Sequence, residues 1–414
     1  MVTALRGPGR EDISLSAVLR GEGGPGRSLS AVAPRLHGPV VLPGCGHWTQ
    51  QERPAEVNAA LLDFLARIDG AGPDDLFERL THPNQTEETT MPARNPILIT
   101  GAAGEIGGVS RTMVDMLLEQ GRPVRAFVRR DDERADSLRR AGAEVFVGDL
   151  LNIADVAAAL KGCRRIYFSM SLSPYYTDAV SLMAAAARAQ GDIEVFVNIS
   201  EYEQSYMTFE KMTAPREERR SWLGGLVTDW SPQHRAHWIS EQVLHWSGIP
   251  SVNVRATIFV ENPILTWLAM GPLSKGELRL PFGLQRLSPI AGYDVAEVCV
   301  KILADPAPHI SKSYELTGPE LKDMHGFAED YGAALGRQVF YIPEEVDAWN
   351  ESYVDSALAE NPHVAEHLKT LTRLVAGGRY DVVTDQLETL LGRQPKTVRW
   401  ALENNPRIRK VAAA

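Results

Sequence analysis

Three glycines at positions 101, 104 and 107 follow an apolar segment over residues 97–99 and precede a helical apolar pattern over residues 109–118. Glycine permits a tight turn, a close approach of the backbone to a ligand, and close packing of a helix on a strand. Free N–H groups and the positive end of the helix dipole then face an anion. This order predicts a site for the pyrophosphate of a dinucleotide, with contacts from Thr100, Gly101, Ala103, Gly104, Glu105, Ile106 and Gly107.

The second predicted strand, Val124–Val128, ends at two arginines, Arg129 and Arg130. Proteins that select NAD place an acidic residue here, where it binds the ribose 2′-hydroxyl. A guanidinium instead suits the additional 2′-phosphate of NADP, although two arginines could also form an ordinary solvated basic turn. We therefore expect NADP, used as NADPH, with NAD as the alternative. After the third strand, Asp149 and Leu150 are expected to place a carboxylate and an apolar wall beside the adenine.

One predicted helix, Pro232–Ser247, carries His234, His237, Glu241 and His245 on a single stripe. Three interpretations are open. The stripe is a metal site, which one helix alone rarely completes, so we predict none. It is a solvated polar face with a Glu241–His245 pair, which is favoured for His234 and His245. Alternatively, and with equal weight for His237, that residue lies near the nicotinamide and handles a proton. His237 is therefore the candidate catalytic residue.

Polar and aromatic residues follow the later predicted strands. Ligands of open parallel sheets bind beyond the carboxyl ends of the strands. We therefore expect contacts to the cofactor from the ends of the fourth and fifth strands, and contacts to a flat substrate from nearby aromatic residues. The alternative is ordinary loop polarity and core packing. The expected cofactor contacts are Ser169, Met170, Ser171 and Ser200, and the expected substrate contacts are Tyr175, Tyr202 and Phe259.

Strands and helices alternate from residue 95 onward. Short apolar runs are separated by helical apolar patterns, which predicts a parallel sheet covered on both faces. Beyond residue 260 the pattern loosens, and the tail from about residue 344 is largely helical in pattern. The predicted fold is α/β, a doubly wound parallel-sheet Rossmann fold with a smaller C-terminal α+β or helical substrate region. Its strands are expected at Ile97–Thr100, Val124–Val128, Glu144–Val147, Arg165–Phe168, 195–199 and 251–255, with a further strand at Ser313–Leu316.

Six motifs give the chain a resemblance to a known family. They are residues 100–107 (TGAAGEIG), 128–130 (VRR), 148–150 (GDL), 247–250 (SGIP), 255–262 (RATIFVEN) and 314–318 (YELTG). Over about 95–410 the chain resembles the NmrA-like branch of the atypical short-chain dehydrogenase/reductase superfamily. The resemblance implies an NADP(H)-binding sheet and an oxidoreductase that reduces a quinone-like or enone-like small molecule by direct hydride transfer. The alternative that it implies is a non-catalytic NAD(P)-sensing regulator that binds a protein partner.

The chain departs from the superfamily at the usual Tyr-x-x-x-Lys pair, in which lysine lowers the pKa of the tyrosine so that it acts as an acid. No tyrosine is followed by a lysine four residues later, and Tyr206 with Lys211 misses the spacing by one. Relatives in this branch often carry a lysine where this chain has His237. Quinones can take their proton from water or another side chain, so the departure weakens alcohol dehydrogenation more than quinone reduction.

Residues 37–68 resemble the C-terminal end of α/β-hydrolases of the epoxide-hydrolase type, through Gly46, His47 and Trp48. By that resemblance His47 would be a general base, but no Gly-x-Ser-x-Gly elbow precedes it. We therefore expect no hydrolase activity. The expected division of the chain is a flexible leader over 1–36, this fragment over 37–68, a linker over 69–94, the Rossmann domain over 95–260, a substrate-binding region over 261–343 and a helical segment over 344–414.

Composition narrows the class of protein. The formal net charge of −10 argues against a general nucleic-acid binder. Cys45, Cys163 and Cys299 are far apart and odd in number, which indicates a reducing compartment. The N-terminus lacks the apolar segment of a signal peptide, and no apolar run approaches membrane-spanning length. We expect a cytoplasmic protein with a small-molecule substrate and no nucleic-acid or membrane partner; a homodimer or a regulatory protein partner remains open.

Overall fold

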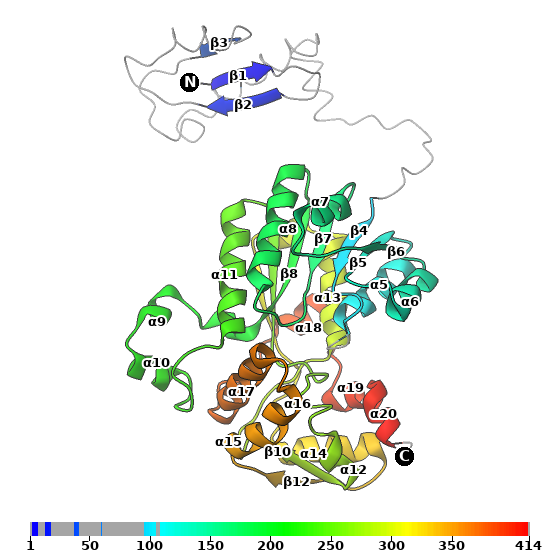
Figure 1. Cartoon of the computed structure of the whole chain (residues 1–414), viewed down its shortest axis with the longest axis vertical. Helices are drawn as coiled ribbons and strands as arrows, with labels where there is room; N and C mark the ends of the chain where they lie inside the picture. Colours follow the sequence, from blue (N-terminus) through cyan, green and yellow to red (C-terminus); the bar gives the residue numbers. More distant parts are fainter. Residues whose placement is uncertain are drawn as a thin grey trace. The chain divides into compact units, whose positions relative to one another are not determined.

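The computed structural model describes residues 95–104 and 108–412, together with Ala59 and the backbones of three strands near the N-terminus. The chain divides into two compact units, Met1–Pro92 and Ala93–Ala414 (Figure 1). In the first unit, β1 (Val2–Arg6) pairs antiparallel with β2 (Ile13–Ala17) and with β3 (His37–Val40).

Two of these strands, β1 and β2, lie within the segment expected to be a flexible leader. The third, β3, lies at the start of the segment that resembles an epoxide hydrolase. His47 and the predicted linker over 69–94 lie outside the described residues.

A seven-stranded parallel sheet organises the second unit (Figure 1). Its order is β11-β9-β8-β7-β4-β5-β6. The second unit therefore begins with the central strand β4 and adds β5 and β6 on one side. The chain then crosses back past β4 to add β7, β8, β9 and β11 on the other side. This is the doubly wound arrangement, so the predicted fold class is confirmed. The strands are β4 (Ile97–Thr100), β5 (Val124–Val128), β6 (Glu144–Val147), β7 (Arg165–Phe168), β8 (Val195–Glu201), β9 (Ser251–Ala256) and β11 (Ser313–Leu316).

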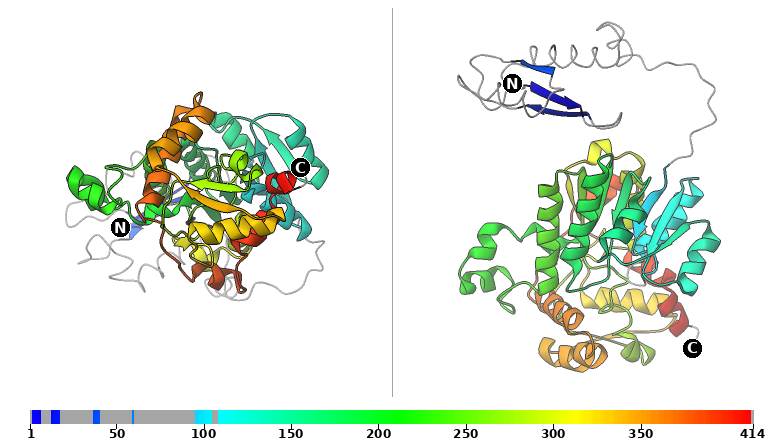
Figure 2. Two further views of the ribbon diagram at one scale, coloured as in Figure 1. Left: turned by 90° about the horizontal axis from the view of Figure 1, so that it is seen from below. Right: turned by 45° about the horizontal axis from the view of Figure 1, so that its top comes forward.

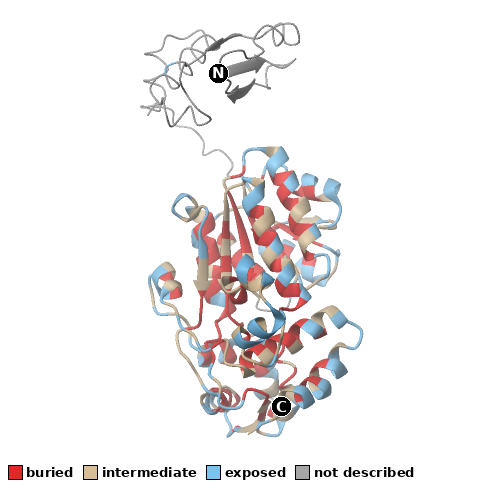
Figure 3. Cartoon of the chain, turned by 90° about the vertical axis from the view of Figure 1, so that its left-hand side faces the viewer, coloured by how far each residue is buried: buried red, intermediate tan, exposed pale blue. Residues whose placement is uncertain are grey.

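The alternation of side chains along the strands supplies two apolar cores, one on each face. On β4, Ile97 and Ile99 pack in the cluster that contains Met113, whereas Leu98 packs in the opposite cluster with Phe168. Successive side chains of a strand point to opposite faces, so one apolar run serves both cores. Figure 3 shows that most of the ribbon of the central strands belongs to buried residues. One face carries α5 (Val109–Glu119), α6 (Glu133–Ala141), α13 (Gly292–Ala304) and α18 (Gln386–Leu391), and the other carries α7 (Ile153–Leu160), α8 (Tyr176–Gln190) and α11 (Pro232–Ser247).

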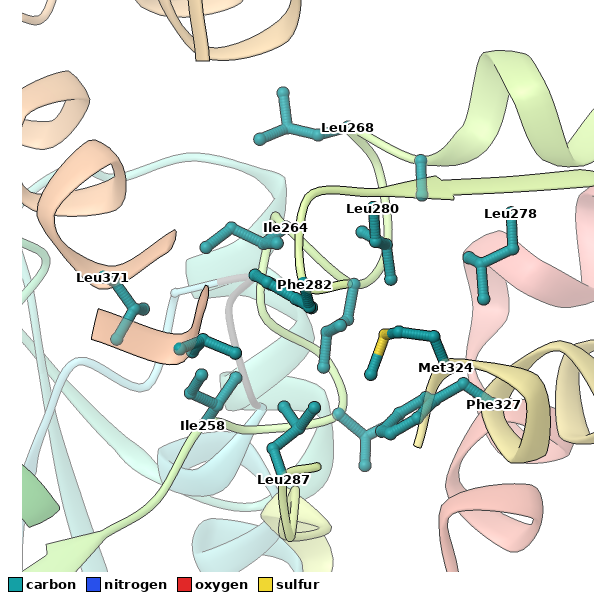
Figure 4. Packing of buried hydrophobic residues seen from close by; sticks show 14 of the residues in the cluster. Ile258, Ile264, Leu268, Leu278, Leu280, Phe282, Leu287, Met324, Phe327 and Leu371 are labelled. Carbon is teal, nitrogen blue, oxygen red and sulfur yellow. The ribbon is translucent and has the colours of Figure 1, made fainter. Parts of the chain in front are cut away.

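A third apolar core lies beyond the carboxyl ends of the sheet strands, where the C-terminal elements gather (Figures 1 and 2). Leu280 and Leu278 of one short strand pack there with Met324 and Phe327 of a helix (Figure 4). The strands β10 (Glu277–Leu280) and β12 (Phe340–Pro343) pair parallel in a sheet of their own. The helices of this region are α12 (Met270–Ser274), α14 (Met324–Leu335), α15 (Val346–Trp349), the π-helical turn η3 (Asn350–Asp355), α16 (Ser356–Leu358), α17 (Pro362–Ala376), α19 (Val398–Asn404) and α20 (Pro406–Ala412).

The sheet is completed by segments that follow residue 260. β11 pairs with β9, and α13 and α18 pack on one face of the sheet. These elements belong to segments that the sequence assigned to the substrate region and the helical tail. The reason is topological, because the chain leaves the sheet after β9, builds part of the third core, and then returns.

Short elements link the larger ones. Between β8 and α11 the chain forms η1 (Tyr202–Ser205), α9 (Phe209–Thr213) and α10 (Arg216–Trp222), and η2 (Ala307–His309) precedes β11. Among the described residues, no helix combines the length and apolar character that crossing a bilayer requires.

Candidate functional site

A cavity of about 1000 Å³ opens at the carboxyl ends of the sheet strands. It is bounded by the turn after β4, by the ends of β5 to β9, and by parts of α11 and α17. Open parallel sheets bind their ligands at this place. Most residues selected from the sequence line it, namely Gly101, Ala103, Gly104, Arg129, Arg130, Asp149, Leu150, Ser169, Met170, Ser171, Tyr175, Ser200, His237 and Phe259.

Two of the expected contacts are not on the cavity wall. The buried hydroxyl of Thr100 donates to the carbonyl of Ser169 at 2.7 Å and accepts from the N–H of Ser169 at 2.8 Å, so it joins β4 to β7. The ring of Tyr202 is also buried, and its centroid lies 5.7 Å from that of Tyr206 and 6.3 Å from that of Tyr380. Thr100 was selected as part of the glycine-turn motif and Tyr202 as an aromatic substrate contact, but each side chain is turned into the protein. Outside the described residues lie Glu105, Ile106 and Gly107.

The turn after β4 has a backbone that only glycine accommodates. Gly101 has a φ of +71°, and a Cβ there would lie 2.9 Å from the carbonyl oxygen of Ser169. A side chain would be strained by this φ and would press on fixed backbone. The N–H of Gly104 donates to the carbonyl of Gly101 at 2.9 Å, which closes the turn. Within the described residues, no side-chain hydrogen bond caps α5 at Gly108, so the start of this helix suits an anion.

Positive charge lines one wall of the cavity. Arg129 and Arg130 follow β5 directly, and both are exposed and border the cavity. The loop after β6 is fixed beside them, because the N–H of Asp149 donates to the Asp155 carboxylate at 2.9 Å. An anion would therefore meet guanidinium groups at the end of β5. We call this wall the arginine end and define it as Gly101, Gly104, Arg129, Arg130 and Asp149.

The opposite wall is apolar apart from a group of ionisable side chains. It begins at the end of β8, three strand spacings from β5, or about 14 Å across the sheet. Apolar side chains come from the segment after β9 and from α17. An aromatic or otherwise flat molecule would therefore find apolar surface here. We call this wall the histidine end and define it as Glu201, His237, Phe259, His367, Leu368 and Leu371.

Three imidazoles converge on one carboxylate at the histidine end. The Nε2 of His234 lies 3.1 Å from Oε2 of Glu201. The Nε2 atoms of His237 and His367 lie 3.3 Å and 3.5 Å from Oε1 of the same residue. All three histidines are buried, and the ring of His237 lies 4.3 Å from that of Tyr176, centroid to centroid. The arrangement holds a carboxylate in place beside the cavity.

Burial controls the protonation of this group. Burial lowers the pKa of His234 to about 3 and also lowers the pKa of His367, so both imidazoles are neutral at pH 7. Burial alone would raise the pKa of Glu201, but the imidazoles of His367, His234 and His237 outweigh it and lower that pKa below its usual range. Glu201 is therefore an ionised carboxylate.

A second carboxyl on the cavity wall behaves in the opposite way. Burial raises the pKa of Glu261 to about 7, although the N–H of Gly292 donates to both of its oxygens at 3.2 and 3.3 Å. Glu261 therefore changes its charge near neutral pH. Burial also raises the pKa of Tyr176, whose hydroxyl donates to the carbonyl of Ile199 at 3.3 Å. That phenol is not available as an acid.

The α11 stripe is not the solvated face that one interpretation expected. His234 and Glu241 are buried, and His245 alone of the stripe is exposed. Glu241 does not pair with His245. Its carboxylate accepts from the Arg255 guanidinium at 2.6 Å and from the Ser200 hydroxyl at 2.7 Å. The predicted surface pair is wrong because β9 brings Arg255 to the buried side of the helix, which the spacing along α11 alone does not reveal.

Among the cavity-wall residues that the sequence analysis did not select, three show why such residues are hard to predict. Glu261 is part of the 255–262 motif, but its proximity to the cavity depends on the turn after β9. His367 lies in the tail, and its only sign in the sequence was a polar residue among the apolar positions of α17, next to Leu368. Tyr380 follows α17 and has no motif around it. The contact between His367 and Glu201, for example, joins segments that are more than a hundred residues apart in the sequence.

One relative matches only a short stretch of the chain. Over 30 residues the chain is 60% identical to epoxide hydrolase A of Mycobacterium tuberculosis, which is 7% of this chain and 9% of that protein. The match is consistent with the resemblance of residues 37–68, and it is far shorter than a hydrolase fold.

Comparison with known proteins bears on the second unit. A model for an NAD(P)H-binding family matches residues 101–306. The chain is 26% identical over 303 residues to an NAD(P)H azoreductase of Xenophilus azovorans, covering 73% of this chain and 94% of that protein. The fold is similar to that of the Escherichia coli NADPH-dependent quinone oxidoreductase complexed with NADPH, with a TM-score of 0.59, 21% identity and coverage of 73% and 97%.

The fold is also similar to that of NmrA, a negative transcriptional regulator crystallised in complex with NAD. The TM-score is 0.60 at 19% identity, and the coverage is 78% of this chain and 99% of that chain. The resemblance that the six motifs indicate is thus supported by an independent family match and by fold. Residues 101–306 therefore match an NAD(P)H-binding family, and the second unit has the fold of NmrA and of the quinone oxidoreductase.

Proposed function

We propose that the chain reduces a flat, conjugated small molecule of the quinone or enone class with NADPH. The observation that carries the proposal is one cavity with two unlike walls, the arginine end for a dinucleotide and the largely apolar histidine end for an acceptor. The names of the relatives agree in kind, since one is an azoreductase and another a quinone oxidoreductase.

The residues of the arginine end fit NADPH. Gly101 leaves the space that a Cβ would fill, and the uncapped start of α5 supports binding of the pyrophosphate there. Arg129 and Arg130 would hold the 2′-phosphate, and Asp149 with Leu150 would border the adenine. Further contacts are proposed from Ala103, Ser169, Met170, Ser171 and the backbone near Ser200, whose hydroxyl already donates to Glu241.

Reduction of such an acceptor adds a hydride and a proton. NADPH, when bound, supplies the hydride. The proton must come from a group that touches the cavity, and His237 lines it. The Nδ1 of His237 is buried and makes no hydrogen bond within the described residues, so it can bond to a ligand. We assign His237 the role of proton donor to the acceptor oxygen, with Glu201 orienting its ring through Nε2 at 3.3 Å.

The acceptor would lie against the apolar side chains of the histidine end. Phe259 and Tyr175, both on the cavity wall, are proposed to cover its faces, and Leu368 and Leu371 of α17 would close the pocket on the far side. A flat, conjugated molecule gains more from such surfaces than a small alcohol does. This preference agrees with the lack of a Tyr-x-x-x-Lys pair.

The proposal is tested by following NADPH absorbance with a panel of quinones, enones and simple ketones. Steady consumption with quinones or enones, and slow or no consumption with simple ketones, is the expected result. No turnover with any acceptor, together with tight nucleotide binding, would reject the reductase and favour the alternative.

That alternative is a non-catalytic NAD(P) sensor that regulates a protein partner. The missing Tyr-x-x-x-Lys pair and the similarity in fold to NmrA favour it. Calorimetry would then show binding of oxidised and reduced nucleotides with different affinities and no turnover. A homodimer and a cytoplasmic location also remain predictions; Cys163 and Cys299 are buried free thiols, as a reducing compartment would leave them.

A further inference from the structure

We infer that Glu201, His234 and His367 form a binding site for a divalent transition-metal ion of the zinc type. The three residues come from the end of β8, from α11 and from α17, so the fold joins segments that lie far apart in the sequence. One ligand atom from each lies within 4.8 Å of the others. The inference is independent of the proposed function, because metal content is measured without a substrate.

The spacing of the donor atoms suits a small metal ion. Ligand atoms that lie 2.0–2.1 Å from zinc at tetrahedral angles are about 3.3 Å apart. The Nε2 of His234 is 3.1 Å from Oε2 of Glu201, and the Nε2 of His367 is 3.5 Å from Oε1. Two imidazoles and one carboxylate favour zinc and its neighbours over calcium or magnesium, which prefer oxygen ligands.

The protonation of the two imidazoles is linked to Ser231. The Oγ of Ser231 lies 2.9 Å from Nδ1 of His234 and 3.0 Å from Nδ1 of His367. A serine hydroxyl has one hydrogen and can donate to only one of them. The N–H of Ser231 also donates to Nδ1 of His234 at 3.3 Å. An imidazole that donates from Nδ1 to the Ser231 oxygen turns the lone pair of its Nε2 toward Glu201, as a metal-binding histidine does.

Two further observations favour a ligand here. The Nε2 of His234 is fully buried and makes no hydrogen bond with the described part of the chain, although Glu201 is only 3.1 Å away. Such an atom is rare without a partner. Ser231 bonds to both Nδ1 atoms and fixes the direction of both rings, as the outer partners of metal-binding histidines do.

The site faces the cavity. Glu201 and His367 border it, and His234 lies behind them with no exposed surface. Three protein ligands would therefore leave one coordination position open for water or an acceptor oxygen. If the proposed function holds, an ion here would polarise that oxygen.

The test uses the full chain, purified without a histidine tag. Its metal content is measured by mass spectrometry, and Zn²⁺ is then titrated by calorimetry into chelator-treated protein. We expect about one ion per chain in the wild type and in the H245Q control, whose histidine is exposed on the same helix. In E201Q and H367Q we expect affinity at least about tenfold weaker.

Circular dichroism confirms that each variant is folded before its affinity is compared. Wild-type protein that neither carries a transition metal nor takes up Zn²⁺ would overturn the inference and leave a cluster held together by protons. Equal Zn²⁺ affinity in E201Q, H367Q and the wild type would overturn it as well. Loss in both variants with retention in H245Q would support it.

Discussion

The two ends of the cavity are built in opposite ways. The arginine end uses backbone and exposed guanidinium groups from turns that directly follow β4, β5 and β6. The histidine end uses buried side chains from β8, α11, α17 and the segment after β9. The first end therefore depends on a few local conformations and on charge. The second depends on tertiary packing, so changes there should affect the reaction more than nucleotide binding.

The largest expected effect is at the histidine end. H237Q removes the proposed proton donor, so we expect kcat for quinone reduction to fall by about 10²- to 10⁴-fold. The Kd for NADPH should change little, because the nucleotide lies mainly against the other wall. H245Q on the same helix is the matched control, and it should behave like the wild type. Equal kcat in H237Q and the wild type would remove His237 from the reaction.

The next effect is at the turn after β4. G101A forces a side chain into a φ of +71° and places its Cβ 2.9 Å from the Ser169 carbonyl, so we expect NADPH binding to weaken by about 100-fold. G121A is a matched control, since Gly121 has a φ of +65° with nothing within 4 Å of its Cβ position. It shows the effect of φ alone. Calorimetric titration compares the two, and similar affinities would contradict a pyrophosphate site at Gly101.

A smaller effect is expected on the preference for NADP⁺ over NAD⁺. R129A removes a charge-assisted contact to the 2′-phosphate, so the Kd for NADP⁺ should rise by about tenfold while the Kd for NAD⁺ stays the same. R140A, on the exposed side of α6, provides the control. Equal weakening for both nucleotides would show that Arg129 does not read the 2′-phosphate.

The smallest effect concerns stability and pH. Burial raises the pKa of Glu261 to about 7, above the ordinary value of 4.5 that applies when the chain is unfolded. Protonated Glu261 therefore favours the folded state, and this contribution is lost as the pH rises through 7. Since water reaches the group from the cavity, we expect the loss to be about 1–2 kcal/mol. The Tm of E261Q should match the wild type at pH 4.5 and exceed it at pH 8. Parallel pH profiles would show that Glu261 stays ionised.

The difference between the local arginine end and the tertiary histidine end also explains what the sequence could predict. The bounds of β4, β5, β6 and β7 were predicted because each is a short, largely apolar run with a proline, glycine or polar residue within two positions of either end. The arginine end follows from those strands, since its residues are next to them in the chain. Two residues near the ends of β4 and β8, Thr100 and Tyr202, were also predicted as site residues, but their side chains turn inward.

The rest depends on contacts between distant segments. β10 and β12 are four-residue strands that pair only with each other, about sixty residues apart, so neither has a local signal. His367 has no partner near it in the sequence, and its neighbours Glu201 and Ser231 are fixed only when α17 packs beside α11. Likewise, Glu241 was matched to His245 by helical spacing, whereas β9 supplies Arg255.

The position of α17 has a consequence for how the protein is made. Every strand of the large sheet lies before residue 317, but His367, Leu368 and Leu371 are translated only later. A ribosome that has released the first 361 residues has exposed the turn after β4 and all of the sheet, but the α17 side chains of the histidine end are missing. The arginine end is therefore synthesised first, and the histidine end is completed only when α17 emerges.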